Sequence, residues 1–78
     1  MASTLTVGFI GCGKMATALA QGFIRANLVA PAQLIGSDVA EESRAAFSRA
    51  TGAVTTAHNR EVLQAAGVVV LADRKSVV

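Results

Sequence analysis

A short glycine-rich segment carries the clearest chemical signal in the sequence. Gly11, Gly13 and Ala16 have the spacing G-x-G-x-x-A, directly after an apolar run and directly before a helical pattern. In this pattern the first glycine allows a tight turn, the second lets the backbone approach a pyrophosphate, and the third small residue lets the helix pack closely on the strand. The backbone N–H groups of Gly13, Lys14 and Met15 would point at the phosphates. The segment predicts dinucleotide binding, and a purely structural turn is the alternative.

Polar residues after the second apolar run offer a place for the adenosine ribose. Ser37 and Asp38 end that run, and Arg44 follows one to two helical turns later. An acidic residue at this position accepts a hydrogen bond from the ribose 2′-hydroxyl, whereas an arginine with small polar neighbours accommodates a 2′-phosphate. Asp38 and Glu41 also form a capping-box pattern, so Asp38 is alternatively the N-cap of a helix. These residues do not decide between NAD and NADP.

Two other reactive side chains stand alone. Cys12 is the single cysteine, so it has no partner for a disulfide or a metal pair. We expect it to be a small side chain that fits where bulk is excluded. His58 is the single histidine and has no cysteine or carboxylate cluster beside it in the sequence. We therefore expect no metal site.

Alternating periodicities indicate the elements that hold these residues. Short apolar runs predict strands at residues 5–10, 33–37, 53–56 and 68–71, and helical patterns run from 14 to about 26, from 39 or 40 to 51, and from 59 to 66. Gly52 suits the C-terminal end of the second helix, and Asn59 is expected to cap the third. We expect the third strand at an edge. The fourth has the composition of a fully buried strand, but as an outer strand with no helix after it, it would leave much of its apolar surface facing water. The order βαβαβαβ predicts an α/β fold, a partial, truncated Rossmann-like doubly wound parallel sheet.

The composition excludes several classes of protein. The chain has 78 residues, of which 53% are hydrophobic and 15% charged, with a net charge of +2. This mixture is unlike a disordered chain, and no apolar run is long enough for a membrane helix. The basic residues are scattered and there are three Phe with no Trp or Tyr, so we expect no nucleic-acid partner. With no secretory signal visible, we expect a cytoplasmic protein without a membrane partner.

Four separate segments resemble pyrroline-5-carboxylate reductase, the family that completes proline synthesis. Residues 7–19 (VGFIGCGKMATAL) resemble the family's opening strand, glycine loop and helix. Residues 34–38 (LIGSD) are similar to its second strand, 56–61 (TAHNRE) to the turn before its third helix, and 69–72 (VVLA) to its fourth strand. The resemblance extends over residues 5–72.

The resemblance implies a cofactor and a set of residues that bind it. In the intact enzyme, reduced nicotinamide would deliver a hydride to the C=N bond of a cyclic imine, giving proline. NADP is the expected cofactor, with NAD possible. The implied cofactor-binding residues are Ile10, Gly11, Cys12, Gly13, Lys14, Met15, Ser37, Asn59 and Ala72.

The resemblance also implies what these 78 residues lack. In the family, an all-helical C-terminal domain builds most of the substrate site and the dimer. We expect residues 1–72 to be an incomplete N-terminal dinucleotide-binding domain, inactive alone, with no catalytic residue and no homo-oligomer. The family continues into Val-Lys-Pro, but this chain has the charged run 73–78 (DRKSVV), which we interpret as a non-native tail. The alternatives are another oxidoreductase of the same fold, such as an F420-dependent NADP reductase or a β-hydroxyacid dehydrogenase, or a non-catalytic nucleotide-binding module.

Overall fold

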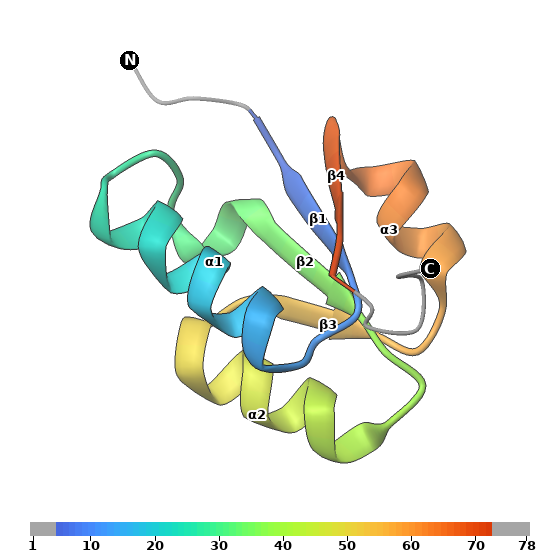
Figure 1. The fold of residues 1–78 in the computed structure, drawn as a ribbon. Coiled ribbons are helices and arrows are strands. Elements are labelled where there is room, and N and C mark those ends of the chain that lie inside the picture. Colours follow the sequence, from blue (N-terminus) through green and yellow to red (C-terminus); the bar gives the residue numbers. More distant parts are fainter. Residues whose placement is uncertain (1–4, 73–78) are drawn as a thin grey trace.

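A parallel sheet with helices on both faces forms the described part of the molecule. The computed structural model describes residues 5–72, so the expected tail at 73–78 lies outside the described residues. The elements are β1 (Val7–Ile10), α1 (Lys14–Arg25), the 3-10 turn η1 (Pro31–Gln33), β2 (Leu34–Ser37), α2 (Glu41–Thr51), β3 (Val54–Thr56), α3 (Asn59–Ala65) and β4 (Val68–Leu71), shown in Figure 1. Within these residues the strand order is β3-β2-β1-β4, with every neighbouring pair parallel. The predicted α/β class and strand–helix order are confirmed.

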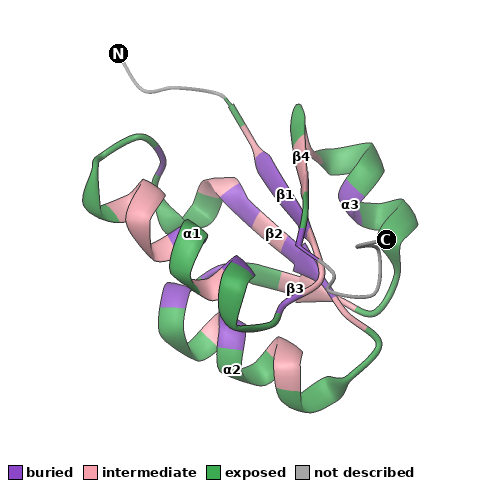
Figure 2. Ribbon diagram, in the orientation of Figure 1, coloured by how far each residue is buried: buried purple, intermediate pink, exposed green. Residues whose placement is uncertain are grey.

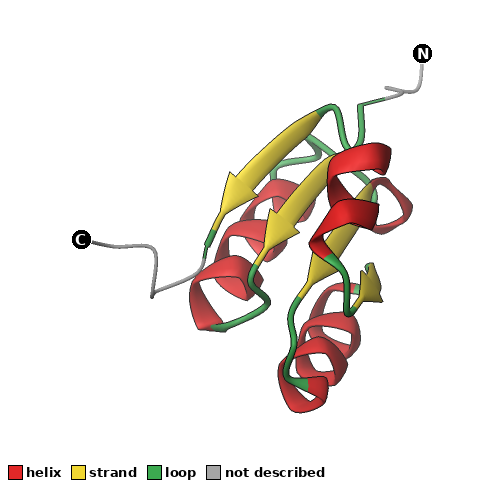
Figure 3. Ribbon diagram, turned by 90° about the vertical axis from the view of Figure 1, so that its right-hand side faces the viewer, coloured by secondary structure: helices red, strands yellow, loops and turns green. Residues whose placement is uncertain are grey.

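The two faces of the sheet are covered by different helices (Figures 1 and 3). On one face, the Phe9 ring of β1 packs against Phe23 of α1 and Phe47 of α2, with centroids 6.1 and 5.7 Å away. On the other face, α3 crosses β1 at Gly8, where an added Cβ would lie 2.4 Å from Val62 Cγ1. Successive strand residues point to opposite faces, so Gly8 faces α3 and Phe9 faces α1 and α2.

Small residues allow the close packing of the first layer. Ala16 and Ala20 are the buried residues of α1, and Phe47 is the fully buried ring of α2 (Figure 2). Met15 is 58% exposed, although the helical pattern groups it with Phe23 on one face. The face of α1 that packs on the sheet is therefore made by its alanines. Ala16 has the packing role that the glycine motif assigns to it.

The helix starts differ from the sequence prediction. α2 begins at Glu41, and its N-cap is Ala40, with no side chain as a cap. The prediction that Asp38 caps this helix is wrong, because the N-cap lies two residues later and the Asp38 carboxylate bonds to the N–H groups of Ala40 and Cys12, outside the helix. α3 has His58 as its N-cap, and Asn59 is its first helical residue, so Asn59 does not cap it. Gly52, with φ +78°, ends α2 as expected.

The edge strands also test the prediction. β3 lies at one edge, as expected, and β4 at the other. β4 is not fully buried, because Val68 is 46% and Leu71 66% exposed. Only Val70 packs on the core. An edge strand has a single neighbouring strand, and α3 makes its main contacts with β1, β2 and β3. No helix within residues 5–72 is long and apolar enough to cross a membrane.

Candidate functional site

The glycine loop presents an uncapped helix start to open space. Gly11 has φ +103°, a left-handed conformation that favours glycine, and its N–H donates to Ser37 O at 2.7 Å. Gly13 is the N-cap of α1, and no side chain of the described residues caps that helix. A Cβ built on Gly13 would meet nothing within 4 Å. The N–H groups of Gly13, Lys14 and Met15 are thus free of a side-chain cap, at the positive end of the helix dipole.

Asp38 is fixed against this loop. Its Oδ2 accepts a hydrogen bond from the Cys12 N–H at 3.0 Å, and its Oδ1 accepts one from the Ala40 N–H at 2.9 Å. The Arg44 guanidinium donates to the Asp38 carbonyl oxygen at 2.7 Å and to Val39 O at 3.5 Å. Partial burial of the Asp38 carboxyl opposes ionisation. The hydrogen bonds from Ala40 and Cys12, with the charge of Arg44, outweigh that effect and lower its pKa. A carboxylate therefore stands beside the loop at neutral pH.

The Cys12 side chain is a packing group. It is 2% exposed, and an added Cβ on Gly36 would lie 2.8 Å from its Sγ. Burial, followed by the Asp38 carboxylate, raises the pKa of the Cys12 thiol to about 11, although Arg44 acts in the opposite direction. A protonated, buried thiol is a weak nucleophile. This agrees with the expectation of a small side chain at a place where bulk is excluded.

Ser37 and Asn59 form a hydrogen-bonded pair between β2 and α3. Ser37 is 0% exposed, and its hydroxyl donates to Asn59 Oδ1 at 2.6 Å. The turn before α3 is held by Thr56, whose Oγ1 accepts the His58 N–H at 3.2 Å and also bonds to Glu61. The sequence identified Ser37 and Asn59 separately. It did not identify their contact.

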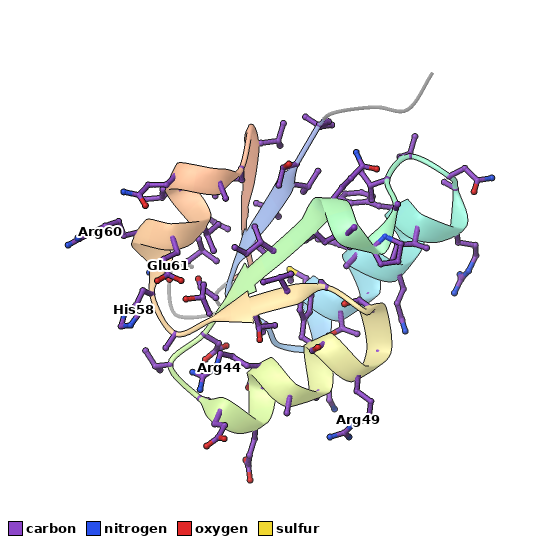
Figure 4. The ribbon with its side chains drawn as sticks, turned by 180° about the vertical axis from the view of Figure 1, so that it is seen from behind. Arg44, Arg49, His58, Arg60 and Glu61 are labelled. Carbon is purple, nitrogen blue, oxygen red and sulfur yellow. The ribbon has the colours of Figure 1, made fainter. Side chains whose placement is uncertain are left out.

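A hollow lies beside this pair. It has a volume of about 530 Å³ and is lined by Val39, Ala57, His58, Asn59, Arg60 and Glu61. Figure 4 shows His58, Arg60 and Glu61 at the start of α3, with Arg44 on α2 at the same end of the sheet. The sequence reasoning missed Val39, which is 91% exposed. Its position directly after the polar end of β2 was the available signal.

The backbone brings the predicted site residues to one edge of the sheet. Ser37 O accepts from Gly11, and the Ala72 N–H donates to Ile10 O at 2.9 Å. The end of β1 therefore touches the ends of both β2 and β4. This is the switch point of a doubly wound sheet, because β2 and β4 flank β1 on opposite sides. Among residues 5–72, no cluster of histidine, cysteine and acidic residues could hold a metal ion.

The donors at this edge fit a dinucleotide. The uncapped N–H groups at Gly13 suit a pyrophosphate, and the space at the Gly13 Cβ position is what a close phosphate needs. The Asp38 carboxylate and the hollow lie at the end of β2, where the adenosine half of a dinucleotide binds in such folds. The residues present therefore fit the group that the glycine motif implies.

Known proteins of similar sequence and fold are reductases. The chain is 42% identical over 77 residues to pyrroline-5-carboxylate reductase 3 of Rattus norvegicus. This match covers 99% of the chain and 28% of the relative. It is 35% identical over 66 residues to pyrroline-5-carboxylate reductase of Methanosarcina acetivorans, a match that covers 85% of this chain and 24% of that relative. The structure of a pyrroline-5-carboxylate reductase from Coxiella burnetii matches with a TM-score of 0.80 and 34% identity, over 91% of this chain and 26% of that one. The resemblance found in the sequence is confirmed.

The chain thus spans about a quarter of the length of the relatives it matches, 28% in the rat protein. The family model that matches residues 6–77 is described as NADP oxidoreductase, coenzyme F420-dependent. That description implies a nicotinamide dinucleotide and a small-molecule substrate. By this match over nearly its whole length, the chain belongs to the coenzyme F420-dependent NADP oxidoreductase family.

Proposed function

We propose that this chain is the dinucleotide-binding part of a pyrroline-5-carboxylate reductase, an enzyme that reduces 1-pyrroline-5-carboxylate to proline. The observation that carries the proposal is the uncapped start of α1 at the Gly13 loop, in a fold that matches the Coxiella reductase with a TM-score of 0.80. Relatives that bear this name, at 42% identity in the rat protein, support the choice of substrate. In this proposal residues 1–72 form the dinucleotide-binding domain.

The proposed roles follow from where the residues lie. The loop of residues 10–15 surrounds the pyrophosphate, which accepts hydrogen bonds from the N–H groups of Gly13, Lys14 and Met15 at the uncapped start of α1. Asn59 contacts the cofactor from the start of α3. Ala72, paired with Ile10, begins the segment next to the nicotinamide ribose. When bound, reduced nicotinamide supplies the hydride that the imine carbon accepts. The described residues bind and orient the cofactor, and we assign none of them a catalytic role.

We propose NADP as the cofactor, with NAD as the alternative. The family's description names NADP, and the Arg44 guanidinium lies at the turn after β2, within reach of a 2′-phosphate once it leaves the Asp38 carbonyl. The Asp38 carboxylate favours NAD instead, since it would repel a 2′-phosphate and accept a hydrogen bond from a ribose hydroxyl. The titration of the chain with NADPH and with NADH decides between them. We expect Arg44→Gln to weaken only NADPH binding, and Asp38→Asn to strengthen it.

A second candidate function comes from the family's description. It names coenzyme F420, so the substrate of the reduced nicotinamide would be the oxidised deazaflavin rather than a cyclic imine. The test uses the intact protein encoded by the source gene. Oxidation of NADPH is followed with 1-pyrroline-5-carboxylate and, separately, with oxidised coenzyme F420. Turnover with the imine alone supports the reductase, and turnover with the deazaflavin alone overturns it.

A further inference from the structure

The hydroxyl of Ser37 has no exposure to solvent. Ser37 ends β2 with its side chain on the face that α3 covers, and its exposed fraction is 0%. A buried hydroxyl needs a hydrogen-bond partner, and its partner here is Asn59 Oδ1 at 2.6 Å. Within residues 5–72, every buried side-chain polar atom has a partner. Ser37 is therefore satisfied inside the protein, with no surface left to touch a ligand in this conformation.

The same hydrogen bond orients the amide of Asn59. An asparagine amide has one acceptor oxygen and one NH₂ group with two donors. Because Oδ1 accepts the hydrogen bond from Ser37, the acceptor end of the amide is held against β2, and the two N–H donors of Nδ2 take no part in that bond. Asn59 is an exposed residue and lines the hollow beside Val39 and His58. The lining of the hollow thus includes an asparagine whose amide oxygen is held by a buried hydroxyl.

We propose that Ser37 is a positioning residue for dinucleotide binding, and that it acts through Asn59 rather than by touching the cofactor. The proposal rests on the proposed dinucleotide function of this site. Asn59 Nδ2 donates to an acceptor oxygen of the cofactor, from phosphate or ribose. Ser37 holds that donor in place before the cofactor arrives, so binding does not have to order the side chain.

A double-mutant cycle tests the coupling of the two residues. The dissociation constants of NADPH and NADH for the 78-residue chain are measured by the change in nicotinamide fluorescence. We expect Ser37→Ala to weaken binding of the tighter dinucleotide by about threefold to tenfold, the effect of freeing one ordered side chain. We expect Asn59→Ala to weaken it at least as much. In the Asn59→Ala background, Ser37→Ala should have no further effect, because the group it positions is gone.

Two further variants separate positioning from general stability. Ser37→Thr keeps the hydroxyl donor and should restore most of the affinity lost in Ser37→Ala. Thr51→Ala is the matched control, since the buried Thr51 hydroxyl donates to Phe47 O at 2.7 Å, in a part of α2 away from the site. It should lower the stability of the chain to denaturant and leave the dissociation constant unchanged.

The outcomes are distinct. Equal losses from Ser37→Ala in the wild-type and Asn59→Ala backgrounds would overturn the positioning role, since the serine would then act independently of the asparagine. An unchanged affinity in Ser37→Ala would also overturn it, while the proposed function would stand. If the wild-type chain binds neither dinucleotide, the proposed function fails, and this inference fails with it.

Discussion

Replacing Gly13 by alanine separates the folding role of the glycine loop from its binding role. Gly13 has φ −77° and ψ −163°, extended backbone that alanine also adopts. Its added Cβ would meet no protein atom within 4 Å. The open space in front of Gly13 is where we place the pyrophosphate. The methyl group of Gly13→Ala would therefore meet the cofactor and nothing else.

The expected change in stability is close to zero, because two effects offset each other. Alanine has fewer unfolded conformations than glycine, which stabilises the folded chain by about 0.4–1 kcal/mol at a compatible site. Alanine is also a poorer N-cap than glycine, at a cost of roughly 0.5–1 kcal/mol. For binding, a methyl group between the N–H donors of α1 and a phosphate lengthens those hydrogen bonds. The loss of one charge-assisted hydrogen bond, about 1.5–3 kcal/mol, weakens binding roughly 10-fold to 150-fold.

The assay measures both quantities on the same protein. Urea unfolding gives the free energy of unfolding of the wild-type chain and of Gly13→Ala, and fluorescence titration gives their affinity for NADPH and NADH. We expect unfolding free energies within about 0.5 kcal/mol of each other and a large loss of affinity. If Gly13→Ala bound as tightly as wild type, the pyrophosphate would not lie at the loop, and the dinucleotide site would have to be placed elsewhere.

Three further predictions concern Gly8, Cys12 and Asp38. Gly8→Ala places a Cβ 2.4 Å from Val62 Cγ1, so we expect it to lower the unfolding free energy by about 1–3 kcal/mol in the same urea assay. An unchanged unfolding free energy would contradict the close packing of α3 on β1. Because the pKa of Cys12 is raised to about 11, its thiolate at about pH 8 is roughly 100-fold scarcer than that of an ordinary cysteine. Iodoacetamide should therefore label the folded chain at least 100-fold more slowly than the urea-unfolded chain, and labelling at equal rates would refute the burial. The Asp38 pKa is lower in the folded state than in the unfolded state, so its contribution to stability is complete above about pH 4 and is lost as the pH falls through the folded value. Asp38→Asn should flatten the acid limb of a plot of stability against pH, whereas an unchanged limb would show that other carboxyl groups dominate it.

Local sequence patterns were enough to predict the order of the elements. The change from period two to helical period marks each joint, and a glycine or a short polar turn lies at most of them. Gly11 and Gly52 have positive φ in the structure, as a tight turn and a helix end require. β1 is shorter than predicted. Leu5 is apolar and Thr6 is β-branched, yet the paired residues start at Val7. Composition alone does not show where pairing begins.

For β4, composition predicted full burial wrongly, whereas the expected outer position of the strand predicted its exposure correctly, because burial depends on neighbours. A run of four aliphatic residues, 68–71, is typical of a parallel strand covered on both faces. Among residues 5–72, β4 pairs with β1 alone, through the register Val7↔Val68. Leu71 and Val68 remain 66% and 46% exposed. The composition of a strand shows how much apolar surface it could bury. The elements that pack beside it determine how much is buried.

The N-cap prediction for Asp38 was wrong for a different reason, and the error locates the site. Asp38 and Glu41 have the spacing of a capping box, a local pattern, yet the carboxylate reaches 26 positions back to the Cys12 N–H. The register explains this choice. Ile10 pairs with Ser37, so the first residues after β1 and β2 must lie side by side. An N–H of the glycine loop is a donor without a helical partner, and a carboxylate is the strongest acceptor near it. The parallel pairing of β1 and β2 therefore predicts a contact between the glycine loop and the residue after β2. This prediction holds even though the capping-box pattern assigns the Asp38 side chain to α2.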